Sequence, residues 1–199
     1  MSIPELTEAD ALRETCSAIV DESKQKGHYQ EWANRLSEYL DWFQSADEDE
    51  RASEEFQRRL WNDNPVSATG QGNINVDAFL EDGALRQWLA HELSRAYPES
   101  ARERRAQIVE LMDQVHERIF PLFPKNPLLK LYRVMATAFP RDFTTIAHAA
   151  KLVRLHRAMG LADESRAIRC QFAIVDRIAE VLGPPQETHA ALAERMMLP

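Results

Sequence analysis

The chain has 199 residues, of which 44% are hydrophobic and 28% charged, and its formal net charge is −8. These fractions are typical of a soluble globular protein of one large domain or two small ones. The sequence predicts no membrane span, because no apolar run approaches the required length, and the acidic start of the chain lacks the apolar core of a signal peptide. We therefore expect a cytoplasmic protein, and its acidity argues against one that coats nucleic acid with its whole surface.

Residues 1–62 predict an acidic helical extension. Residues 1–60 hold 15 acids and 7 bases. Apolar residues recur at helical spacing over three stretches, at about 7–26, 29–43 and 49–61, and Gly27 separates the first two. The acidic run 47–50 is typical of a helix start, where carboxylates face the positive end of the helix dipole.

The stretch "LWNDNPVSATGQGNINV", residues 60–76, interrupts this helical pattern. It lacks the G-x-x-x-x-G-K-[ST] pattern that wraps phosphates, and a lone "GQG" is a weak dinucleotide signal. We interpret it as a connector in which Gly70 and Gly72 permit positive φ. A recognition loop is the alternative.

Residues 63–199 predict a helical body. Helices are expected at about 84–97, 100–119, 127–138, 145–160 and 167–182, with a last short helix after Pro184-Pro185. The prolines at 121, 124 and 127 predict a rigid extended connector between the second and third of these. The predicted fold class is all-α, an irregular multi-helix domain of eight or nine helices, either in two parts or continuous. The apolar end "AERMMLP" suggests that more protein follows residue 199.

The sequence offers little for catalysis, cofactor binding or metal binding. Cys16 and Cys170 have no disulfide or zinc spacing and are expected to be buried small hydrophobes. The carboxylate–histidine pair Asp113-x-x-His116 occurs once, whereas a di-iron site needs two glutamate–histidine pairs. His156 falls on the apolar side of its helix and is expected in the core with one hydrogen bond. We expect no enzyme, no cofactor and no metal site in this chain.

Basic residues gather in residues 124–174, which hold 9 bases and 3 acids. On two predicted helices and the loop between them, the cations are placed to contact phosphates or an acidic partner. On the second helix, Ala147 and Ala158 lie between the cations, where small side chains permit close approach. A solvated basic face is the alternative. The candidate contact residues are Lys130, Arg133, Arg141, Lys151, Arg154 and Arg157.

Three stretches, "LWNDNPVSATGQGNINV", "FPKNPLLKLYRVMATAFPRDFTTI" and "LVRLHRAMGL", resemble the helical segment that precedes the AAA+ motor in some McrB-like restriction proteins. The similarity covers about residues 60–162. In its most distinctive piece, "AFPRDFTTI", Phe139 and Phe143 are expected to pack between two helices. Pro140 is expected to end the first helix, and Thr144 or Thr145 to cap the second.

The resemblance implies a non-catalytic recognition or adaptor domain of an anti-phage defence system. Its implied partners are DNA, a nuclease subunit or another protein, and a motor after residue 199 through which the protein oligomerises. No nucleotide-binding residue carries over, because no such motif occurs in this chain. The alternative is a protein–protein scaffold without nucleic-acid binding, whose acidic first 60 residues dock a basic partner.

Overall fold

The computed structural model describes residues 6–67 and 74–199, and every regular element in them is helical. The all-α prediction is confirmed, with more helices than the eight or nine expected. The first six are α1 (Ala9–Gln25), α2 (Gly27–Ser45), α3 (Glu48–Ala52), α4 (Glu54–Asn62), α5 (Asp77–Glu81) and α6 (Gly83–Ser94). They are followed by α7 (Ala101–Arg118), the 3-10 helix η1 (Phe120–Leu122), α8 (Leu128–Ala138), α9 (Ala149–Ala158), α10 (Ala167–Leu182) and α11 (His189–Met197).

Side-chain caps explain where several helices begin. The Asp47 carboxylate accepts a hydrogen bond from the backbone N–H of Glu50 at 2.8 Å, which starts α3. The Ser53 hydroxyl accepts from Phe56 N at 3.2 Å and starts α4. The helix expected over 49–61 is therefore two helices, because Ser53 has extended backbone and caps the second.

The segment 139–148 between α8 and α9 agrees with the prediction in its first half and differs from it in the second. Phe139 and Phe143 are buried, and α8 ends before Pro140, as predicted. The predicted cap at Thr144 or Thr145 is wrong, because α9 begins only at Ala149. The Thr144 hydroxyl instead contacts Gln171 Oε1 at 2.7 Å and accepts from the backbone N–H of residue 146 at 3.1 Å. The extended connector predicted before α8 also contains a helical turn, η1.

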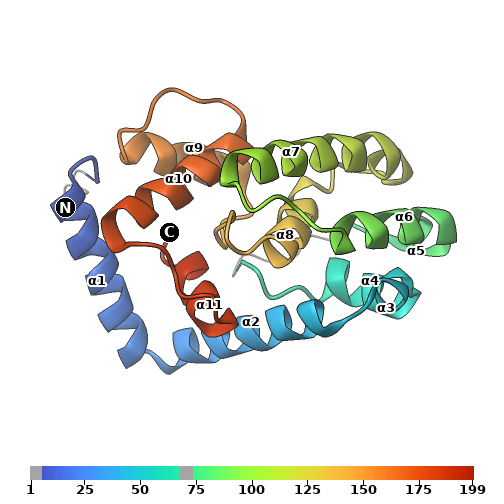
Figure 1. The fold of residues 1–199 in the computed structure, drawn as a ribbon, viewed down its shortest axis with the longest axis horizontal. Coiled ribbons are helices and arrows are strands. Elements are labelled where there is room, and N and C mark those ends of the chain that lie inside the picture. The colour runs from blue at the N-terminus through green and yellow to red at the C-terminus, as the bar shows by residue number, and fades with distance from the viewer. Residues whose placement is uncertain (1–5, 68–73) are drawn as a thin grey trace.

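Helix α8 lies in the middle of the molecule (Figure 1). Helices α2 and α4 pack against it, and α7 runs along the opposite side in this view. Helix α11 packs against α2, while α1 and α9 both pack against α10. Every residue of α8 from 130 to 137 is buried, so this helix has no solvent face over that stretch.

One hydrophobic core runs through both predicted parts of the chain. Leu36 and Leu40 of α2 belong to the same buried cluster as Val134 of α8 and Leu192 of α11. Residues 1–62 thus contribute to the core of the body instead of forming a separate core. No helix in the described residues is long and apolar enough to cross a membrane.

The predicted connector is described only at its two ends. Residues 68–73, with Gly70 and Gly72, lie outside the described residues. Val66 before them and Val76 after them are both buried, at 0% and 1% exposure. Both ends of the connector are therefore anchored in the core.

Candidate functional site

The structure divides the six predicted contact residues into three groups. Lys130 and Arg133 lie inside the protein, with 3% and 1% of their surface exposed. Lys130 Nζ donates to Trp61 O at 3.2 Å and to Asn62 Oδ1 at 2.6 Å, at the end of α4. Burial lowers the pKa of both cations. The prediction that these two residues contact a partner is therefore wrong, because α4 covers the side of α8 from which Lys130 projects.

Arg141 is exposed but already has a partner in the chain. Its guanidinium forms a salt bridge of 2.8 Å with Glu187, in the segment between α10 and α11. Both side chains are more than half exposed, so solvent screens this pair strongly. This one contact neutralises part of the Arg141 charge and leaves other N–H donors of the guanidinium for a partner.

The remaining three cations share the exposed side of α9. Lys151, Arg154 and Arg157 are all exposed, and none forms a salt bridge within residues 6–67 and 74–199. At the rise of an α-helix, successive members stand about 4.5 Å apart along the axis, about 9 Å from first to last. We call these three residues the α9 basic face.

The other side of α9 holds the helix against the core. Leu152, His156 and Met159 are buried, which agrees with the predicted apolar side. His156 is 2% exposed, and its Nδ1 has no hydrogen-bond partner in the described residues. Ala147 is buried and precedes the helix, so of the two small residues expected between the cations only Ala158 lies on α9.

A buried carboxylate next to this region was not predicted from the sequence. Asp142, 1% exposed, accepts from Arg104 Nε at 2.6 Å and from Arg105 Nε at 2.8 Å. Arg105 also forms two hydrogen bonds to the carboxylate of Asp176 on α10, at 2.7 and 2.8 Å. The first turns of α7 thus supply two arginines to a buried ion network. The sequence feature that could have indicated this burial is a single acid next to Phe143 in an otherwise basic segment.

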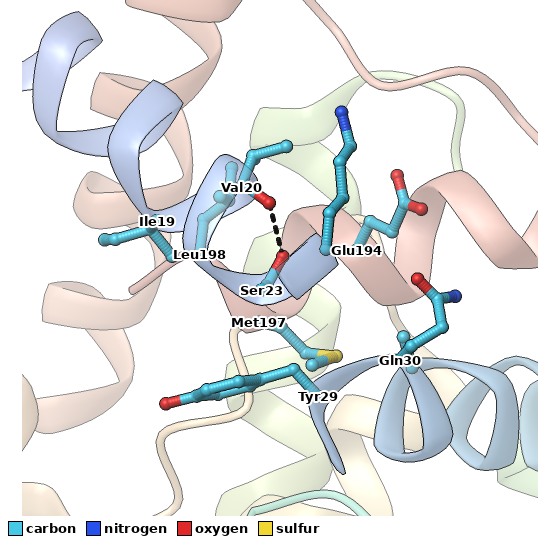
Figure 2. Close-up of a pocket in the computed structure, with 10 residues that line it drawn as sticks. Ile19, Val20, Ser23, Tyr29, Gln30, Glu194, Met197 and Leu198 are labelled. Atoms are coloured by element: carbon cyan, nitrogen blue, oxygen red, sulfur yellow. Dashed lines mark hydrogen bonds between the residues drawn. The ribbon is translucent and has the colours of Figure 1, made fainter. Parts of the chain in front are cut away.

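A notch between α1, α2 and the end of α11 is a small apolar hollow (Figure 2). Ile19, Tyr29 and Met197 line it, and the Ser23 hydroxyl at its edge donates to the Val20 carbonyl at 2.7 Å. Its volume is about 80 Å³. Ligand pockets are usually about 300–1,000 Å³, so this notch has room for one apolar side chain at most.

The cysteine prediction is confirmed, since Cys16 and Cys170 are both buried and free. Burial raises the pKa of both thiols, which makes them poor nucleophiles at neutral pH. In the described residues, no group of three or more histidine, cysteine or acidic side chains is placed to hold a metal ion.

Comparison with protein-family models, curated proteins and solved structures finds no match to this chain. The resemblance to McrB-like proteins therefore stays a prediction. The site is defined by its geometry alone, as a short helix with three unpaired cations on its outer side.

Proposed function

We propose that this chain is a non-catalytic recognition domain that contacts the phosphate backbone of DNA through the α9 basic face. The observation that carries the proposal is the state of Lys151, Arg154 and Arg157. They are exposed, on one helix, and without a salt bridge in the described residues, although the chain has an excess of acids. Unpaired cations concentrate positive potential at one place on the surface. The acids elsewhere on the protein repel DNA.

The spacing of the three cations suits a polyanion. Duplex DNA carries one charge per about 1.7 Å of its axis, so a helix side about 9 Å long meets several phosphates. Three contacts give positioning without base recognition, because phosphate contacts carry no sequence information. The resemblance to McrB-like proteins points in the same direction, with a motor and a nuclease subunit as further partners.

The test is fluorescence anisotropy with a labelled duplex, plain and cytosine-methylated, titrated at several salt concentrations. We expect the logarithm of affinity to fall linearly with the logarithm of salt, with a slope of about −2.7 for three phosphate contacts. Replacing the α9 basic face by glutamine (Lys151→Gln, Arg154→Gln, Arg157→Gln) should weaken binding about equally for all sequences.

A matched variant controls for net charge. Lys24, Arg35 and Arg102 are exposed cations on α1, α2 and α7, and their replacement by glutamine changes the charge by the same amount. This control should keep most of the affinity. Equal losses in both triple variants would show that only net charge matters, and unchanged affinity in the α9 variant would remove the proposal.

A protein–protein scaffold is the second candidate. It is favoured by the exposed carboxylates at the start of α3, where Asp47, Glu48, Asp49 and Glu50 follow one another. No DNA binding even at low salt, with capture of a basic protein that depends on these four acids, would support this candidate over the first.

A further inference from the structure

A cleft opens between α7, α8 and the first residues of α9 and α10. Its volume is about 320 Å³, within the usual range of about 300–1,000 Å³ for small-molecule sites. Apolar side chains such as Met112, Leu128 and Leu131 form much of its wall. Asp113 and His116, the single carboxylate–histidine pair of the sequence, lie at its edge.

Tyr132 gives the cleft a hydroxyl at the end of a buried ring. The residue is 3% exposed, lines the cleft, and its ring stands edge-on to Phe143 at 6.3 Å between centroids. Its hydroxyl makes no hydrogen bond within the described residues. Burial raises the pKa of Tyr132, so the hydroxyl stays protonated and can donate at neutral pH. The ring is buried, but the hydroxyl oxygen is not among the fully buried polar atoms that lack a partner, so it is accessible from the cleft and available to a bound molecule.

Two helices begin at the cleft. Ala149 and Ala167, the first residues of α9 and α10, both line it, and neither helix has a side-chain cap hydrogen bond at its N-cap residue. The Glu164 carboxylate accepts from the N–H groups of residues 165 and 166, at 2.8 Å each, just before α10. Lys151 N and Arg169 N already donate to the carbonyls of His148 and Arg166, so the first two N–H groups of each helix remain, and they favour negative charge.

The rim of the cleft contains more donors than acceptors. Arg166 forms one contact with Asp113, from Nη2 to Oδ1 at 3.2 Å, and both side chains are about half exposed. A guanidinium has five N–H donors, so this single contact leaves others for a ligand. His116 packs its ring on Phe120 and faces the same rim.

We propose that this cleft binds a small organic anion, a carboxylate on an apolar body. The carboxylate accepts from the Tyr132 hydroxyl and the Arg166 guanidinium near the start of α10. The apolar body lies on Met112, Leu128 and Leu131. This site is separate from the α9 basic face, and the proposal does not depend on DNA binding.

The experiment follows backbone amide NMR shifts of the full chain during titration with benzoate and hexanoate to millimolar concentrations. Benzamide and hexanamide are the matched probes, with nearly the same shape and no charge. We expect benzoate or hexanoate to shift amides of α7, α8 and the starts of α9 and α10, and the amides to bind at least tenfold more weakly, as about expected for losing a charged hydrogen-bonded group.

Tyr132→Phe separates binding from folding. Its hydroxyl has no partner in the described protein, so the melting temperature should stay the same or rise, while carboxylate affinity falls about tenfold. Arg166→Gln should also weaken binding, and Arg102→Gln, an exposed α7 arginine outside the cleft, should not. Absence of shifts at the cleft, equal binding of acid and amide, or full affinity in Tyr132→Phe would each overturn the proposal.

Discussion

The buried carboxylate of Asp142 joins three parts of the fold. It lies in the turn after α8, its two arginine partners are on α7, and Arg105 reaches on to Asp176 of α10. The arginine side chains are only about 15% exposed, so solvent screens these pairs weakly. We predict that Asp142→Asn, which keeps the shape and removes the charge, destabilises the protein strongly.

The magnitude follows from what the substitution leaves behind. Removing one partner of a buried ion pair costs about 3–5 kcal/mol, because the remaining charge stays buried without compensation. Asparagine keeps one oxygen acceptor for an arginine, so we expect the lower end, about 3 kcal/mol. For a chain of this size, about 2–4 °C of melting temperature corresponds to 1 kcal/mol, which gives a loss of about 6–12 °C.

Urea unfolding followed by circular dichroism measures this loss in the free energy of unfolding. Asp176→Asn is the matched control, since this aspartate binds the same arginine but is 56% exposed. We expect the control to lose less than about 1 kcal/mol, as exposed pairs do. If the two variants lose equal stability, the buried network does not hold α7, α8 and α10 together, and the reasoning is refuted.

Three further predictions test other parts of the structure. Lys130→Met should lower the free energy of unfolding by about 1–3 kcal/mol and leave DNA affinity unchanged, because the acceptors of Lys130 on α4 are a buried carbonyl and a partly buried amide oxygen. Lower affinity at unchanged stability in parallel urea and anisotropy measurements would contradict this. Burial raises the pKa of Tyr97 from 10.0 to about 12, so its neutral form stabilises the fold below pH 10.0 and this stability is lost as the pH rises toward 12. In urea unfolding, Tyr97→Phe should lose less free energy of unfolding than the wild type between pH 10.0 and 12. If the two proteins lose it equally with pH, Tyr97 does not cause the loss. Gly160→Ala should lower the melting temperature, because φ is 66° and the new Cβ would lie 2.6 Å from Thr7 Cγ2, and adding Thr7→Ser should restore part of the loss; an unshifted Gly160→Ala variant would contradict the clash.

Local patterns predicted most of the helical segments and the buried side of α9, but not the break at Ser53 or the late start of α9. Leu152, His156 and Met159 repeat at helical spacing, and a short helix on the outside of the molecule needs no more information than that. The same reasoning failed on α8. Periodicity placed Lys130 and Arg133 on one side of their helix, but it does not reveal whether another helix covers that side.

The missed features depend on residues far apart in the chain. Asp142 is buried because Arg104 and Arg105, 38 and 37 residues away, reach it from α7. Thr144 resembles a helix cap, yet its hydroxyl contacts Gln171, 27 residues further on, and α9 starts later. The Thr144 hydroxyl can either cap a helix or bond elsewhere, and here it bonds to a residue distant in the sequence.

The packing of α11 on α2 also has a consequence for how the chain folds. The two helices are joined across 148 residues by a contact between His189 Nδ1 and the Asp41 carboxylate. Contacts this distant must close a long loop before they stabilise anything, so folding should be slow for an all-helical protein. During synthesis the part of α2 that α11 covers stays exposed until residues 189–197 have left the ribosome. A nascent chain of this protein therefore needs protection from aggregation longer than its helical content suggests.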